Sequence, residues 1–254
     1  YDVALKKDLP RTALGVLGRI EKKGRVEKQY GNVLKALICR MDLEESIAPD
    51  SLAGEIKRLE AAELGMRTKQ PVLAAVYQSA LAQIYNKHRP NDDYDIAAKN
   101  YYRLSVKHPE LLAKTSATGY EPLLKAGIDS RIFNNDLLHV VGLYAGDFAT
   151  LHKYYAAHGN RPAACLTAMK ALEKSRDAST KVARKSRYLH CLDSLIEVYR
   201  DLPEAGELAI EHYNFISGST DTPAESLVNY INYALNQWGK WPRMNVLRNA
   251  LLGL

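Results

Sequence analysis

The sequence predicts an all-α fold built from antiparallel helical hairpins that stack side by side. Apolar residues recur every three or four positions in each long segment, which is the spacing of one helix face. These segments run for about 12 to 20 residues, an ordinary helix length, and short turns rich in Pro, Gly and Asn separate them. No pair of alternating strands with a hairpin turn occurs. Helices joined by short turns pack antiparallel against their neighbours.

The first half of the chain opens on the run Lys7-Asp8-Leu9-Pro10, in which Asp8 can cap a helix and Pro10 needs no N–H donor. Apolar spacing is clearest from Pro71 to His88, where several Ala residues allow a neighbouring helix to approach closely. Clusters of turn-forming residues separate the helical segments. We expect helices over 10–23, 26–46, 52–64, 71–88 and 94–108.

A boundary between two lobes, 1–117 and 118–254, is predicted where Thr118 and Glu121 have capping-box spacing beside Gly and Pro. Both lobes belong to a single all-helical module spanning residues 1–254. The apolar run at 137–144 has the composition of a buried strand, but its periodicity continues to Tyr155 and favours a helix. A second capping box is predicted at Thr222-Pro223-Ala224-Glu225. We expect helices over 137–155, 163–173, 179–199, 204–215 and 224–237.

The helices expected at 179–199 and 204–215 are joined at Leu202-Pro203 and resemble a tetratricopeptide hairpin. They carry small residues inside, Tyr at the helix ends and Pro between the helices. The predicted fold class is therefore all-α, with antiparallel helical hairpins stacked as a tetratricopeptide-like right-handed solenoid. A regular period of about 34 residues is missing, so we expect divergent repeats.

The composition is that of a folded globular chain, because 46% of the residues are hydrophobic and 25% are charged. Tyr outnumbers Phe by 16 to 3, which predicts half-exposed helices in a thin structure, since Tyr packs its ring and keeps its hydroxyl hydrated. The net charge of +6 is explained by solubility, with binding to nucleic acid or an anionic surface as the alternative. No apolar run of about 18 residues is present, so we expect no membrane-spanning segment.

None of the patterns that mark nucleotide-binding loops, zinc proteases, serine hydrolases, calcium loops or CxxC sites occurs. We therefore predict a chain that is not an enzyme and has no catalytic, cofactor-binding or metal-binding residues. One group suggests a metal ion instead, namely Asp136, His139, Asp147 and His152, because Asp136 and His139 share a helix face. The apolar run around His139 favours a histidine of the core or of an interface, with its hydrogen bonds satisfied.

The three cysteines, Cys39, Cys165 and Cys191, lie in apolar helical stretches without CxxC spacing. This pattern predicts buried free thiols, with a disulfide between Cys165 and Cys191 as the open alternative. His190 precedes Cys191, and a His beside a Cys suggests an activated thiolate. Adjacent residues on a helix do not face each other, so we expect no catalytic pair here.

Two groups of cations and one aromatic pair complete the candidate features. A cluster near 174–187 is interpreted as a solvated helix face, because a single-stranded nucleic-acid site would interleave aromatic residues and only Tyr188 is present. Nucleic acid is therefore not an expected partner. Trp238-Gly239-Lys240-Trp241-Pro242 predicts a cap on the last hairpin or on a following domain, with a binding patch as the alternative. The cations are Lys174, Arg176, Lys181, Arg184, Lys185 and Arg187, and, around a helix end, Lys22, Lys23, Arg25 and Lys28.

The opening run, extended over Lys7-Asp8-Leu9-Pro10-Arg11-Thr12-Ala13-Leu14, resembles the N-terminal helical region of large bacterial alpha-2-macroglobulin-like proteins. The resemblance covers roughly residues 5 to 90 and is looser beyond them. It lies in a helical pattern and not in catalytic residues. Further matching stretches are Ile20, Leu34-Lys35-Ala36-Leu37, Asp50-Ser51-Leu52 with Ile56 and Leu59, residues 72–85, and Asp129-Ser130-Arg131 before 136–144.

This resemblance implies a non-catalytic helical scaffold or interaction module at the N-terminus of a longer protease trap or inhibitor. Such proteins are periplasmic or associated with the cell envelope, so the resemblance implies that location. The chain begins on Tyr, and we expect it to be a piece of a longer protein. The expected partners are adjoining domains of the same chain or another protein, and no oligomeric state is predicted. No thioester run of the Cys-Gly-Glu-Gln type occurs, so no functional residue is transferred. The alternative is a stand-alone tetratricopeptide-like adaptor that binds peptides.

Overall fold

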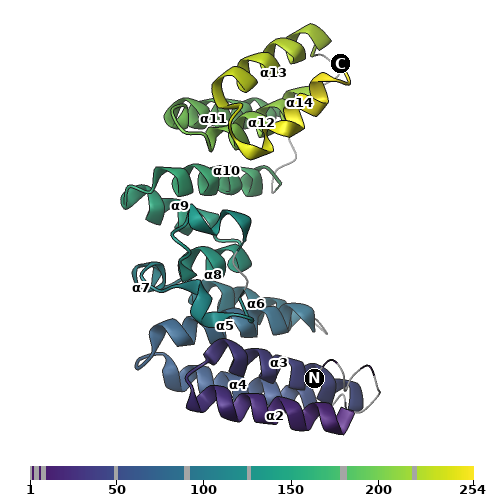
Figure 1. The fold of residues 1–254 in the computed structure, drawn as a ribbon, viewed down its shortest axis with the longest axis vertical. Coiled ribbons are helices and arrows are strands. Elements are labelled where there is room, and N and C mark those ends of the chain that lie inside the picture. Colours follow the sequence, from purple (N-terminus) through teal and green to yellow (C-terminus); the bar gives the residue numbers. More distant parts are fainter. Residues whose placement is uncertain are drawn as a thin grey trace. The chain divides into compact units, whose positions relative to one another are not determined.

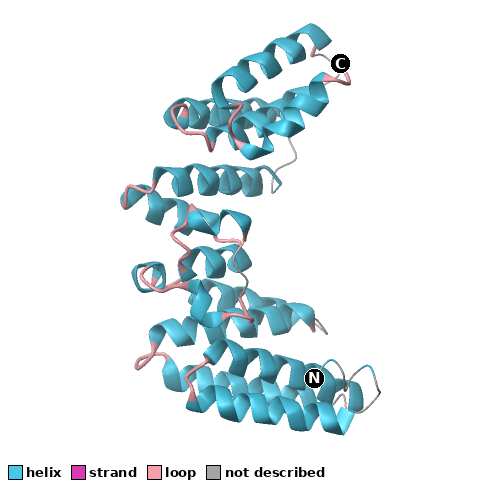
Figure 2. Cartoon of the chain, in the orientation of Figure 1, coloured by secondary structure: helices cyan, strands magenta, loops and turns pink. Residues whose placement is uncertain are grey.

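The structure is a computed structural model that describes residues 2, 6, 10–48, 51–88, 92–124, 127–177, 182–218 and 222–254. Over these ranges the chain forms α-helices and short 3-10 turns and no strand (Figures 1 and 2). An isolated β-bridge pairs Ser116 with Asp136. The prediction of an all-α fold is confirmed. Among the helices described, none combines the length and the apolar composition needed to cross a bilayer.

The chain folds into two compact units, Tyr1–Asp147 and Phe148–Leu254. The segment at 118–122, where the sequence predicts a lobe boundary, lies inside the first unit. There η2 (Ala117–Tyr120) packs on α3 (Tyr30–Ile47). The contact is so close that a Cβ added to Gly31 would lie 2.4 Å from the carbonyl oxygens of Tyr120 and Glu121. The Gly and Pro residues of this segment therefore mark a packing contact within a unit.

The first unit is built from helices that pack mainly against near neighbours in the sequence. Figure 1 shows α2 and α3 side by side, and α3 also contacts α5 across the intervening helix. Because the connections between them are short, consecutive helices pack antiparallel. Besides α3 and η2, the elements are α2 (Pro10–Val26), α4 (Leu52–Met66), α5 (Pro71–Lys87), α6 (Asp92–Ser105), α7 (Pro109–Ala113), η3 (Ile128–Arg131) and α8 (Leu137–Ala145).

Helix α5 is the centre of this unit. Its residues from Leu73 to Ala82 are all buried, and α3, α4, α6 and α8 all contact it. Small side chains such as Ala75, Ala80 and Ala82 allow these helices to come close on several sides. Each larger apolar side chain buried here contributes roughly 1.5–3 kcal/mol, so α5 supplies much of the stability of the unit.

Hydrogen bonds to two glutamates of α4 tie α5 and α6 to it. Glu63 is fully buried and accepts from the Arg67 guanidinium at 2.7 and 2.9 Å and from Gln78 Nε2 at 2.5 Å. The hydroxyls of Tyr85 and Tyr101 both donate to Glu60, at 2.8 and 2.9 Å. A buried carboxylate is tolerated only when such donors replace water, so these bonds fix how α4 sits on its neighbours.

The second unit continues with helices that each contact the next along the chain. Helix α10 also contacts α12, across the intervening helix α11. This nearest-neighbour pattern is typical of stacked helical hairpins. The elements are α9 (Phe148–Ala157), α10 (Arg161–Asp177), α11 (Val182–Tyr199), α12 (Ala205–Ser217), α13 (Ala224–Trp238), η4 (Pro242–Met244) and α14 (Asn245–Leu251).

Three local predictions are wrong. The helix expected over 137–155 is two helices, because Gly146 adopts a left-handed conformation, φ 61°, and ends α8. The Thr222 hydroxyl donates to the Ile216 carbonyl at 2.9 Å and does not cap α13. Ser116, not Thr118, caps η2. In both predicted capping boxes the Thr hydroxyl bonds a different nearby group, Ser116 Oγ for Thr118 and the Ile216 carbonyl for Thr222. Ser and Thr hydroxyls readily form such local bonds. The expected Asp8 cap lies outside the described residues.

Candidate functional site

The metal group considered from sequence, Asp136 with His139, Asp147 and His152, does not assemble. Asp136 instead caps α8, accepting from the backbone N–H of His139 at 2.8 Å. The His152 Nδ1 donates to the Ala164 carbonyl at 3.0 Å within the second unit, whereas Asp147 ends the first. These contacts give Asp136 and His152 structural roles.

His139 is a core histidine, as its apolar surroundings favoured. Its side chain is buried and stacks on Phe133, with ring centroids 3.6 Å apart. Burial lowers the pKa of His139 to about 4, because the charged imidazole would lose its hydration. Its Nδ1 has no hydrogen-bond partner, so the expectation of a satisfied ring is wrong. The ring is therefore neutral near pH 7 and acts as a packing group.

All three cysteines are free thiols, so no bridge joins Cys165 and Cys191. Cys165 is fully buried, and this burial raises the pKa of its thiol to about 12. Cys39 and Cys191 are half-exposed, unlike the buried positions expected. Cys165 is therefore an inert packing residue at neutral pH.

Part of the cation cluster of the second half is structural. Arg176 contacts Glu211 of α12 at 2.5 Å and lies over the Tyr188 ring, 5.2 Å from its centroid. The Tyr188 hydroxyl donates to the same Glu211 at 2.7 Å. These contacts join α10, α11 and α12. The side chains of Lys181, Arg184 and Lys185 lie outside the described part of the chain.

The C-terminal tryptophans act as a cap on the last hairpin, as predicted. Trp238 is buried and its Nε1 donates to the Arg200 carbonyl at 3.0 Å. Trp241 lies against Gly206 and donates from Nε1 to Glu207 at 2.6 Å. Arg243 also contacts Glu207, at 2.6 Å. Trp238 therefore fastens the end of α13 to the turn after α11, and Trp241 fastens the segment after α13 to the start of α12.

A charged cleft of about 200 Å³ lies between α2, α3, α4 and α5 in the first unit. Its arginines are largely engaged with its own carboxylates. Arg40 contacts Glu21 at 2.9 Å and Glu55 at 3.4 Å, and Arg25 contacts Glu21 at 2.8 Å. This network neutralises itself and holds the helices together, so it offers little free charge to a ligand.

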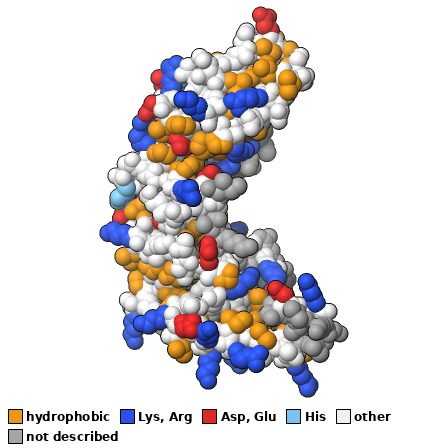
Figure 3. Space-filling model, in the orientation of Figure 1, with side chains coloured by type: hydrophobic (Ala, Val, Ile, Leu, Met, Phe, Trp, Pro, Cys, Tyr) orange, Lys and Arg blue, Asp and Glu red, His pale blue; other side chains and the backbone are white. Residues whose placement is uncertain are grey.

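A larger groove of about 630 Å³ lies in the second unit, at the ends of α11 and α13 and beside α14. Its lining includes the apolar residues Leu202, Pro203 and Leu235 beside the buried Trp238. Three exposed cations also line it, Arg200, Lys240 and Arg248. Its acidic residue, Asp201, is held by Arg161 at 2.5 and 2.7 Å. Figure 3 shows Lys and Arg side chains interspersed with hydrophobic ones over this unit on the face drawn. The groove thus combines apolar area with net positive charge.

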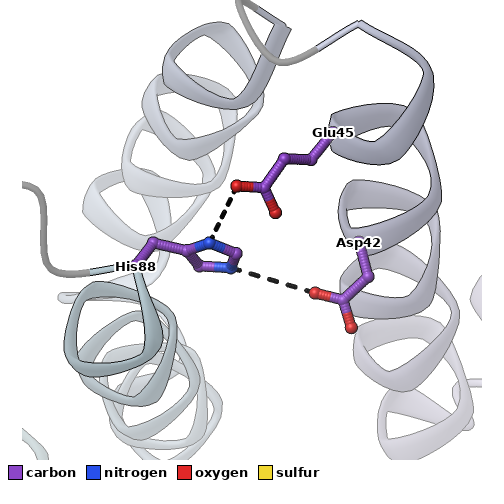
Figure 4. Close-up of side chains that lie close together, drawn as sticks. All are labelled: Asp42, Glu45 and His88. Atoms are coloured by element: carbon purple, nitrogen blue, oxygen red, sulfur yellow. Dashed lines mark hydrogen bonds and ion pairs between the residues drawn. The ribbon is translucent and has the colours of Figure 1, made fainter.

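A second candidate site joins α3 to the end of α5 in the first unit (Figure 4). Asp42 and Glu45 lie three residues apart on α3, and the His88 ring sits between their carboxylates. The Nδ1 of His88 is 3.0 Å from Glu45 Oε1, and its Nε2 is 3.9 Å from Asp42 Oδ1. Within the described residues, these three side chains are the group whose potential ligand atoms all lie within 4.8 Å of one another.

Sequence reasoning missed this cluster because His88 lies 43 residues beyond Glu45. The available signal was the spacing of Asp42 and Glu45, which places both on one face of a helix. Nothing local to His88 indicates which helix it meets.

Comparison with family models, with curated proteins and with solved structures gave no match.

Proposed function

We propose that the chain is a non-catalytic helical interaction module, and that the groove of the second unit binds an acidic segment of a protein partner. The observation that carries this proposal is the combination of accessible apolar side chains at Leu202, Pro203 and Leu235 with cations at Arg200, Lys240 and Arg248. A peptide with apolar and acidic side chains complements both features. The volume of about 630 Å³ is within the range of sites that enclose small ligands or a few side chains.

The arrangement proposed for the helices is a tetratricopeptide-like stack of hairpins. It is supported inside each unit by the way that each helix packs on near neighbours in the sequence. Binding surfaces in such stacks form from side chains that remain exposed after the helices have packed. The groove is lined by helix ends and the turns beside them.

The larger context proposed is the N-terminal part of an alpha-2-macroglobulin-like protease trap of the cell envelope. It rests on the resemblance over the opening helices. In this context the acidic segment belongs to an adjoining domain of the same protein. Intact-mass measurement and cell fractionation of the natural product test it. A much longer product in the envelope fraction supports this context, whereas a cytosolic product of about 28.4 kDa refutes it and favours a stand-alone peptide-binding adaptor.

The groove itself is tested with labelled peptides of acidic, neutral and basic composition, each carrying the same apolar residues. We expect the acidic peptide to bind best. Its affinity should fall as the salt concentration rises. Charge reversal in Arg200→Glu and Lys240→Glu should weaken binding about tenfold each, because both cations lie on the groove.

The matched control is Arg187→Glu, an exposed charge reversal on α11 outside the groove. It should leave binding of the acidic peptide unchanged. Equal affinity for the acidic and basic peptides, or equal loss in the control, would exclude the groove as the binding surface.

A further inference from the structure

We propose that Asp42, Glu45 and His88 form a binding site for a divalent transition metal of the zinc type. The site lies in the first unit and is independent of the groove in the second. It would join α3 to the last turn of α5 through the ion, in addition to the packing that already connects these helices.

The donor set selects this class of metal. One imidazole nitrogen and two carboxylates are ligands that zinc accepts at about 2.0–2.2 Å, with a fourth position left for water. Calcium requires six to eight oxygen ligands, and magnesium requires a near-ideal octahedron of oxygens. Neither requirement is met by a cluster that offers one nitrogen and two carboxyl groups.

The geometry places two donors at the separation that a shared ion needs. Ligands bound about 2.1 Å from one tetrahedral zinc lie roughly 3.4 Å apart. His88 Nδ1 and Glu45 Oε1 are 3.0 Å apart, so a small opening would admit the ion between them. The contact between these two atoms would then be replaced by their bonds to the ion.

The third donor reaches the ion by side-chain rotation. The Asp42 side chain is 38% exposed, so its carboxylate can turn without repacking the core, whereas His88 is only 12% exposed and is the fixed donor. Asp42 is held by Lys87, whose Nζ is 2.5 Å from Oδ1 and whose side chain is 57% exposed. Exposed ion pairs of this kind contribute little to stability, so a metal can displace the ammonium group.

The test uses the full chain freed of metal by a chelator. Zn²⁺ is titrated by calorimetry, and Co²⁺ is added as a probe whose absorption reports its coordination. We expect one Zn²⁺ per chain, and a loss of affinity of at least about 100-fold in His88→Ala, more than removal of an outer partner costs. The control His158→Ala removes an exposed histidine of the second unit and should bind like the unmodified chain.

Two further variants distinguish a metal site from an ion pair. Asp42→Asn keeps the shape of the side chain and should weaken Zn²⁺ binding even if His88→Ala is unstable, which thermal unfolding of each variant will show. Lys87→Ala removes the competing cation and should tighten Zn²⁺ binding several-fold. The proposal is overturned if His88→Ala and His158→Ala bind Zn²⁺ equally, if binding is not one to one, or if Lys87→Ala weakens it.

Discussion

Replacement of Gly31 by Ala should destabilise the first unit, although the same change stabilises most helices. A Cβ at this position would lie 2.4 Å from the carbonyl oxygens of Tyr120 and Glu121. Both atoms belong to backbone, so the whole segment around η2 would have to move off α3. Overpacking of this kind costs up to about 3 kcal/mol, and the gain in helix propensity offsets at most about 1 kcal/mol. We expect a net loss of about 2 kcal/mol.

The matched control is Gly15→Ala in α2, where nothing lies within 4 Å of the added Cβ. That variant should gain up to about 1 kcal/mol from helix propensity alone. Urea denaturation followed by far-UV circular dichroism measures both free energies of unfolding. The slope of each denaturation curve shows whether the variants expose the same surface. If Gly31→Ala is as stable as the unmodified chain with the same slope, the segment at 117–122 does not pack on α3 as described.

Three further predictions concern buried groups. Burial lowers the pKa of His139 to about 4, so between about pH 4 and 6.5 the unfolded chain binds one more proton than the folded chain. Acidification from pH 6.5 to 4 should therefore lower the free energy of unfolding by up to about 3 kcal/mol. His139→Leu should flatten this dependence in denaturation curves taken from pH 7 to 4. Glu207→Gln should cost about 2 kcal/mol because it weakens the bonds that a buried carboxylate accepts from Trp241 and from the exposed Arg243, against no more than about 0.5 kcal/mol for the exposed Glu197→Gln in the same denaturation measurements. Iodoacetamide should modify the half-exposed Cys191 before the buried Cys165, whose thiol pKa burial raises to about 12, and equal rates would contradict that burial.

The helices could be predicted where one face of a regular segment enters the core. Apolar spacing placed a helix over 71–88, and α5 spans Pro71–Lys87. It likewise placed one over 224–237, and α13 spans Ala224–Trp238. In both cases local periodicity and burial agree, so no distant contact was needed to find the element.

The boundaries between lobes and between helices could not be predicted, because they depend on contacts that the local sequence does not encode. Gly119 and Pro122 have the composition of a linker, yet their segment is held against α3 by the close approach at Gly31. Conversely, Gly146 lies inside an apolar periodic stretch and ends α8 through its left-handed conformation. Composition identifies a flexible residue, but tertiary contacts decide whether the chain packs or turns there.

The same limit applies to the candidate sites. Asp136 and His139 have the three-residue spacing expected of paired ligands, but at a helix start that spacing lets the carboxylate cap the backbone instead. Asp42 and Glu45 have the same spacing near the C-terminal end of α3, where the backbone N–H groups are already bonded within the helix and the carboxylates can face a neighbour. Position along the helix, rather than spacing alone, separates a cap from a possible ligand pair.

Both proposed sites lie at helix ends, and the packing of the fold explains why. The middle of a helix such as α5 is covered by its neighbours, so its side chains are committed to the core. The last turn leaves backbone carbonyls unpaired and attracts cations or donors. Arg248 donates to the Gly239 carbonyl at 2.7 Å beside the groove, and His88 ends α5 beside two carboxylates. Changes at these ends should therefore alter binding while the fold persists, whereas changes in mid-helix should alter stability first.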